Sequence, residues 1–258
     1  MTTIEQAWID CLLADVAYVD RLLPGMTGTS LADRIEARMT QPVAEFIGAK
    51  FEVVSVENDR PSDFQGVVFR DKATGDLYLA NRGTAPGKSF QDVVDDIDLA
   101  LSAGIARTQT AAMVNWWLAI SAPRGETVRQ IASTGGVLTP STRIFVAKPA
   151  ILASGDIANE LASVGGKIRV VGHSLGGHLT TVFASLFPDV VTHSSTFNGA
   201  GLFSFSTQRE LHRSIWCRHL GRVEFPDSLW HAGGDLYRRP APEARQLHLD
   251  LHRSLRGR

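Results

Sequence analysis

The chain has 258 residues, of which 44% are hydrophobic and 21% are charged, and its formal net charge is −1. These values are typical of one globular domain with a sizeable core, and the balance of charges argues against a nucleic-acid or polyanion binder. The two cysteines, Cys11 and Cys217, lie far apart and outside any C-x-x-C pattern, so we expect neither a disulfide framework nor a structural zinc site.

No apolar run reaches the roughly 18 residues that a membrane span needs. The apolar stretch at residues 14–18 is short, is flanked by aspartates and has no basic residue before it, unlike a secretory signal peptide. We therefore expect a cytoplasmic protein or one exported by a route without a signal peptide.

Hydrophobic periodicity and turn residues predict ten helices and strands. In chain order they are a helix over 4–22, a strand over 51–56, strands over 66–70 and 77–81 around a turn at 71–75, helices over 90–101, 108–120 and 149–164, a strand over 167–172, a helix over 176–187 and a strand over 190–197. The last strand, helix and strand form a βαβ unit, which requires parallel strands. The expected fold is α/β, with a mostly parallel central sheet and helices on both faces.

The last fifty residues differ in composition from the rest of the chain. Residues 209–258 contain ten arginines, five histidines and no lysine, and their net charge is +4 against −5 for residues 1–208. We therefore predict a core over 1–208 and an atypical Arg/His-rich C-terminal segment over 209–258. Three interpretations of this segment remain open: a basic helical tail, a divergent C-terminal third, or a shifted reading frame.

A G-x-S-x-G motif lies between the strand predicted at 167–172 and the helix predicted at 176–187. It consists of Gly172, His173, Ser174, Leu175 and Gly176. In a nucleophile elbow, a sharp turn from strand to helix exposes the serine and leaves no room for side chains two positions before and after it. Ser174 is therefore the candidate nucleophile, and the backbone N–H of Leu175 is a candidate donor to an oxyanion.

A second motif, Arg82-Gly83-Thr84, follows the strand predicted at 77–81. A small polar residue after a glycine at a strand end can offer both its N–H and its hydroxyl to an oxyanion, so Thr84 is a second candidate donor. Taken alone, this motif is also compatible with an ordinary turn at a strand end.

These motifs occur in an order that resembles the class 3 (fungal-type) lipases of the α/β-hydrolase superfamily, in particular their bacterial branch. The matching segments are residues 13–18, the strand leading to Thr84, the acidic segment 92–98, the elbow at 172–177 and the strand leading to residues 197–201. The resemblance implies an α/β-hydrolase-type fold in which Ser174 is the nucleophile and Thr84 and Leu175 form the oxyanion hole. It also puts residues 85–98 where family members carry a lid. Asn81 departs from the family, which usually has an aromatic residue there.

A serine nucleophile needs a histidine to take its proton and a carboxylate to orient that histidine. In α/β-hydrolases both follow the serine in the chain, which leads to the segment 209–258. Our first choices are Asp227 as the acid and His248 as the base; the alternatives are Asp235 for the acid and His252 and His231 for the base. His248 and His252 are also compatible with two surface histidines on an amphipathic helix, and as a metal site they lack an evident third ligand.

The sequence thus predicts a serine hydrolase that cleaves carboxylic esters of lipids through an acyl-enzyme, without a metal or cofactor. The expected partners are the ester substrate and, transiently, a membrane surface. One alternative is a catalytically impaired lipase fold that binds lipid or a protein partner, and another is a hydrolase for thioesters or peptides. We interpret the acidic residues Asp95, Asp96 and Asp98 as a solvated helix face rather than a metal site.

Overall fold

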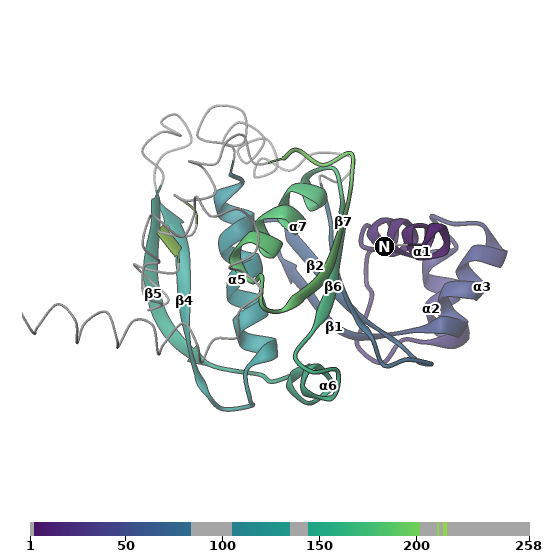
Figure 1. The fold of residues 1–258 in the computed structure, drawn as a ribbon, viewed down its shortest axis with the longest axis horizontal. Coiled ribbons are helices and arrows are strands. Elements are labelled where there is room, and N and C mark those ends of the chain that lie inside the picture. The colour runs from purple at the N-terminus through teal and green to yellow at the C-terminus, as the bar shows by residue number, and fades with distance from the viewer. Residues whose placement is uncertain (1–2, 84–104, 135–143, 202–210, 212–213, 216–258) are drawn as a thin grey trace, which may run out of the picture. The chain divides into compact units, whose positions relative to one another are not determined.

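The computed structural model describes residues 3–83, 105–134, 144–201, 211 and 214–215 (Figure 1). All of them belong to one unit of the chain, Met1–Arg222, and the second unit, Val223–Arg258, lies outside the described residues. The domain boundary that we predict between residues 208 and 209 also falls outside them and stays a prediction.

The described helices are α1 (Ile4–Val16), α2 (Gly28–Ile35), α3 (Gln41–Lys50), α5 (Arg107–Ser121), α6 (Ala158–Ser163) and α7 (Leu175–Leu186). The described strands are β1 (Phe51–Asp59), β2 (Phe64–Asp71), β3 (Leu77–Asn81), β4 (Thr127–Thr134), β5 (Ile144–Leu152), β6 (Ile168–His173) and β7 (Val191–Phe197). The elements predicted near β1, β2, β3, α5, β6, α7 and β7 are therefore confirmed, with shifts at most of their ends. The helix predicted at 90–101 lies outside the described residues.

Five strands form the central sheet in the order β1-β2-β3-β6-β7. The pairs β1–β2 and β2–β3 are antiparallel, whereas β3–β6 and β6–β7 are parallel, so four strands run in one direction and only β2 opposes them. The β6–α7–β7 segment is the predicted βαβ unit. The predicted hairpin between β2 and β3 is also present, and the Asp71 carboxylate accepts hydrogen bonds from the N–H groups of Ala73 and Thr74 in its turn.

Helices cover both faces of this sheet, because neighbouring residues of a strand point to opposite sides. Leu79 and Val170 face the hydrophobic cluster that contains α5 and α7. Val171 and Tyr78, each adjacent in sequence to one of those residues, face a second cluster with α1, α2 and α3. Figure 1 shows the two groups of helices on opposite sides of the sheet, as the sequence predicts.

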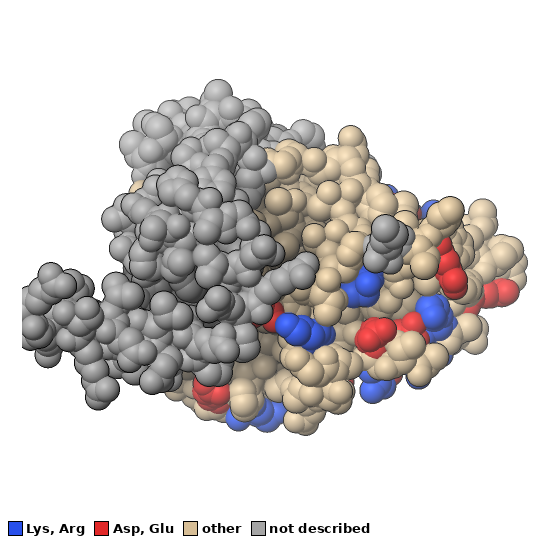
Figure 2. All heavy atoms as spheres, viewed as in Figure 1, with Lys and Arg blue, Asp and Glu red and all other residues tan. Residues whose placement is uncertain are grey.

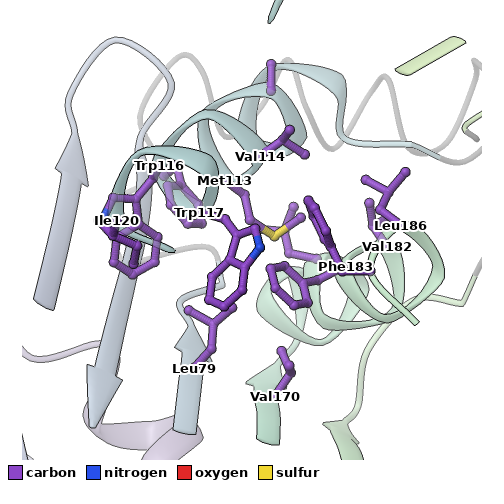
Figure 3. Packing of buried hydrophobic residues seen from close by; sticks show 14 of the residues in the cluster. Leu79, Met113, Val114, Trp116, Trp117, Ile120, Val170, Val182, Phe183 and Leu186 are labelled. Atoms are coloured by element: carbon purple, nitrogen blue, oxygen red, sulfur yellow. The ribbon is translucent and has the colours of Figure 1, made fainter. Parts of the chain in front are cut away.

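The cluster on the α5 and α7 side is built around aromatic rings (Figure 3). Trp117 contacts Phe183 edge to face, with ring centroids 5.0 Å apart, and also packs on Phe187. Trp116, the next residue of the helix, packs instead on Phe64. Both tryptophans are buried, so core packing accounts for the pair.

A separate two-stranded sheet, β4–β5, packs on the outer side of α5. The Asn115 side chain of α5 links the two, because its Nδ2 donates to the Ile131 carbonyl at 2.7 Å and its Oδ1 accepts from the Ile131 N–H at 2.8 Å. These two bonds satisfy both backbone polar groups of one residue of β4 from the side of the helix.

A buried ionic cluster attaches α1 to the sheet. Asp10 is fully buried, and its carboxylate accepts hydrogen bonds from Arg169 of β6 at 3.1 Å and from Ser195 of β7 at 2.6 Å. The Gln6 amide donates to the same carboxylate and to the Tyr78 hydroxyl. Three polar side chains, one on each of three strands, thus fix the helix to the sheet.

Two predicted elements are wrong, and three observed elements were not predicted. The helix predicted at 4–22 ends at Val16, because Tyr18 and Val19 donate to carbonyls three residues back and the apolar residues continue in a buried turn. The helix predicted at 149–164 is the end of β5, followed by Gly155 at a positive φ and the short α6. Helices α2 and α3 and strand β4 were not expected from the sequence at all.

On the face seen in Figure 2, acidic and basic side chains of the described residues are interspersed rather than gathered by sign. No described helix has both the length and the apolar character needed to cross a bilayer. Within the described ranges there is also no group of three or more His, Cys, Asp or Glu side chains arranged to hold a metal ion. Cys11 is a free, exposed thiol, and Cys217 lies outside these ranges.

Candidate active site

Ser174 occupies a strained turn between β6 and α7. Its φ and ψ are 56° and −127°, a conformation that side-chain-bearing residues rarely adopt. The turn is held from β7, because the Ser174 N–H donates to the Phe197 carbonyl at 2.9 Å. This is the geometry of a nucleophile elbow, in which strain presents the serine at the edge of the sheet.

Two glycines make the turn possible by allowing backbone segments to touch. A Cβ atom on Gly172 would overlap the Gly176 carbonyl, and one on Gly176 would overlap the carbonyl of Asn81 at the end of β3. Gly177 is packed against Gly199 in the same way, because a Cβ atom on Gly177 would lie 2.9 Å from the Gly199 Cα atom. The glycines that the sequence analysis assigns to the elbow are thus explained by close backbone contacts.

The end of β3 lies directly beside the elbow. Asn81 pairs with Gly172 in the parallel ladder, and two residues later Gly83 approaches both the His173 carbonyl and the Gly176 amide. Thr84 is the next residue and lies outside the described range. The two motifs, about ninety residues apart in sequence, are therefore brought together as far as Gly83.

Helix α7 begins at the nucleophile and points its N-terminus toward it. The N–H groups of Gly177 and His178 donate to the Ser174 carbonyl, at 2.9 and 3.2 Å. The first N–H groups of a helix have no acceptor within the helix, and those of Leu175 and Gly176 have no backbone acceptor among the residues that the structure describes. Leu175 lies at the N-terminus of α7, and its role as an oxyanion donor stays a prediction.

Arg82, next to Gly83, is buried and held rigidly. Its guanidinium donates to the Gln65 side chain at 2.7 Å and to both the carbonyl and the carboxylate of Asp63 at 3.0 Å. Its backbone N–H donates to the Gln65 carbonyl. The segment that leads to Thr84 is thus fixed to β2 before it reaches the elbow.

Asn81 occupies the position where the class 3 lipases, which the sequence resembles, usually have an aromatic residue. Its side chain is completely buried, and its amide Nδ2 donates to the Thr180 hydroxyl of α7 at 3.2 Å. The polar side chain therefore links β3 to α7 through a hydrogen bond in place of aromatic packing.

His178, four residues after the nucleophile, is buried and plays a structural part that the sequence analysis did not identify. Its Nε2 accepts from the Ala106 N–H at 3.4 Å, so Nδ1 carries the proton and donates to the Ala200 carbonyl at 3.1 Å. Burial lowers its pKa from 6.5 to about 4, although the bond to Ala200 opposes this. With both nitrogens occupied, His178 cannot serve as the base for Ser174.

Within the described residues there are two other histidines, and neither is a partner of Ser174. His173 lies in the elbow itself and contacts Tyr18 through Nδ1 at 3.2 Å. His193 pairs with Arg169 in the sheet, whereas Thr196 pairs with Gly172 beside the elbow. His193 therefore lies three residues, or roughly 10 Å along β7, away from the level of the elbow. The base that the sequence predicts lies outside the described ranges.

The structure thus brings together Ser174, Leu175 and the strand end before Thr84. Asp227 and His248 lie outside the described residues, as do the alternatives Asp235, His252 and His231, and all of these assignments stay predictions. The mostly parallel sheet, with a strained serine between β6 and the N-terminus of α7, is an α/β-hydrolase-type fold.

No protein-family model matches this chain, and no curated protein matches it. Similar solved structures include the Lip2 lipase from Yarrowia lipolytica, which is 15% identical with a TM-score of 0.38, the match covering 85% of this chain and 68% of that one. A fungal lipase in complex with an inhibitor is 14% identical with a TM-score of 0.32, over 72% of this chain and 57% of that one. The M37 lipase is 19% identical with a TM-score of 0.32, over 76% and 59%. This chain spans less than two thirds of the length of the last two.

Proposed function

We propose that the protein is a serine hydrolase of the class 3 lipase type that cleaves carboxylic esters of lipids through an acyl-enzyme. The observation that carries this proposal is the strained Ser174 between β6 and α7, with the end of β3 packed against it at Gly83. A serine held in this conformation at a helix N-terminus serves no evident packing purpose, whereas a nucleophile requires it.

In the proposed reaction, the Ser174 Oγ attacks the carbonyl carbon of the ester and its proton passes to His248, which Asp227 orients. The negative charge that develops on the carbonyl oxygen is stabilised by the N–H of Leu175 and by Thr84. The alcohol then leaves with the proton, and water hydrolyses the acyl-enzyme by the same steps in reverse order. No metal or organic cofactor takes part in this cycle.

The choice of lipid esters rests on the order of the motifs, which resembles the class 3 lipases. Such a substrate implies transient contact with a membrane or lipid surface. A hydrolase for thioesters or peptides would use the same elbow, so substrate profiling distinguishes these possibilities.

The first test is the hydrolysis of p-nitrophenyl butyrate and p-nitrophenyl palmitate by the purified protein and by Ser174→Ala. We expect the variant to lose at least 10³-fold in kcat because the nucleophile is gone. Ser163→Ala is the matched control, since this serine of α6 is exposed and its hydroxyl donates to the Glu160 carbonyl of its own helix. Equal activity of Ser174→Ala and the wild type would refute the proposal.

The base and the acid are located by the same assay on His248→Ala, His252→Ala and Asp227→Ala. The expected result is a large loss of kcat for His248→Ala and Asp227→Ala and little change for His252→Ala. Loss in His252→Ala alone would assign the base to that residue instead.

A catalytically impaired fold that binds lipid or a protein partner is the second candidate. It is favoured by one observation, that none of the three histidines within the described residues is placed to activate Ser174. A folded wild-type protein that hydrolyses neither ester, and whose Ser174 does not react with a fluorophosphonate, would establish this alternative.

A further inference from the structure

The hydroxyl of Tyr18 touches the segments on both sides of the candidate oxyanion hole. Tyr18 lies just after α1, and its O–H donates to the His173 carbonyl at 3.1 Å. Its oxygen is also 3.2 Å from Nδ1 of the His173 ring. Because the hydroxyl proton is given to the carbonyl, the contact with the ring requires a proton on Nδ1, which then donates to the tyrosine oxygen. His173 is the residue immediately before the nucleophile.

The same oxygen is packed against the end of β3. A Cβ atom on Gly83 would overlap the Tyr18 oxygen and would lie 2.5 Å from the His173 carbonyl oxygen and 3.1 Å from the Gly176 nitrogen. Burial raises the pKa of Tyr18, whereas a hydrogen bond from the Gly83 backbone opposes this rise. One hydroxyl thus contacts both Gly83, the last described residue after β3, and His173, the residue immediately before the nucleophile.

The tyrosine ring is itself fixed in place. The Arg38 guanidinium lies over the ring, 4.6 Å from its centroid, and is paired with the Asp15 carboxylate of α1 at 2.7 Å. Near its middle α1 is fixed to the sheet through Asp10. The hydroxyl is therefore presented by a rigid support rather than by a mobile side chain.

We propose that Tyr18 is a positioning residue that holds the end of β3 against the nucleophile elbow, by bonding to His173 and packing against Gly83 at once. This inference rests on the proposed function. Tyr18 does not touch the substrate; it acts through the backbone of the two segments. Donors to an oxyanion must be held within about 0.5 Å of the productive geometry, and a displacement of about 1 Å can cost 10²-fold in rate.

The test is Tyr18→Phe, which removes one oxygen atom and keeps the ring under Arg38. We expect kcat for p-nitrophenyl butyrate to fall about 10- to 100-fold while KM changes less than about twofold, because the oxyanion exists only in the transition state. The matched control is Tyr78→Phe, which removes another phenol oxygen that contacts α1, through Gln6, at the start of β3. The control should keep the wild-type kcat. Thermal unfolding of both variants shows that they are folded.

Amide hydrogen exchange provides a readout that does not depend on activity. Tyr18→Phe should speed exchange in peptides containing Gly83 and in peptides containing Ser174, whereas Tyr78→Phe should leave both unchanged. A wild-type kcat in Tyr18→Phe, or unchanged exchange in both peptides, would overturn the inference while leaving the proposed function intact. If the wild type hydrolyses no ester, the proposed function fails, and exchange alone decides whether Tyr18 holds the two segments together.

Discussion

The elbow depends on two glycines, because their lack of a Cβ atom lets neighbouring backbone segments come close together. Gly172 and Gly176 stand where one Cβ atom would meet backbone that has no freedom to move, because β3, β6 and α7 each have many other contacts. The site is therefore sensitive to very small substitutions, even though its residues lie on a large, well-packed scaffold.

Gly176→Ala should separate the end of β3 from the elbow. Its Cβ would overlap the Asn81 carbonyl oxygen and lie 2.8 Å from the Arg82 carbonyl carbon, so we expect a loss of about 1–3 kcal/mol in the free energy of unfolding and a large loss of esterase activity. Gly201→Ala is the matched control, because its Cβ would meet nothing within 4 Å. Urea unfolding and the ester assay check the prediction, which fails if the two variants behave alike.

At the scale of elements, the N-terminal helix is attached to the sheet by charge as well as by apolar packing. Asp10 is fully buried, and its partner Arg169 has only 20% of its side chain exposed. Removing one member of a buried ion pair leaves the other charge unpaired where water hardly reaches it. In an exposed ion pair, water solvates the remaining charge and the loss is small.

Asp10→Ala should therefore cost about 2–3 kcal/mol in the free energy of unfolding, since the Arg169 guanidinium loses its carboxylate. The control is Glu52→Ala, which breaks the more exposed cross-strand pair of Glu52 with Arg70 and should cost about 0–1 kcal/mol. Chemical unfolding of both variants at neutral pH measures the difference. Equal costs would mean that the buried cluster does not stabilise α1.

At the scale of the whole molecule, burial of His178 makes the stability of the fold depend on pH. In the folded protein its pKa is lowered from 6.5 to about 4, so below pH 6.5 protons bind more readily to the unfolded chain. The stabilising contribution is complete above pH 6.5 and is lost as the pH falls to about 4. The loss amounts to about 3 kcal/mol.

His178→Asn tests this linkage, because an asparagine amide can still donate to the Ala200 carbonyl but does not titrate. The free energy of unfolding of the wild type should fall more steeply between pH 6.5 and 4 than that of the variant. Parallel curves for the two proteins would show that the titration of His178 does not contribute.

The sequence by itself determined the local features. The G-x-S-x-G motif between a strand and a helix predicts the elbow, since a turn this sharp excludes side chains at Gly172 and Gly176. The apolar strands and the Asp71 turn likewise predict β3, β6, β7 and the β2–β3 hairpin. These features depend on neighbouring residues along the chain, which is why residue patterns reveal them.

Only the tertiary structure decided the features that depend on distant partners. The sequence pattern predicts a helix at residues 149–152, but these residues form a strand because they pair with β4. The predicted N-terminal helix stops at Val16, and Tyr18 just beyond it contacts a carbonyl 155 residues away. His178 and Asn81 acquire their roles in the same way, from partners on other elements. Periodicity records which residues are buried, but not which backbone or side chain each one meets, and at this site those contacts determine the geometry.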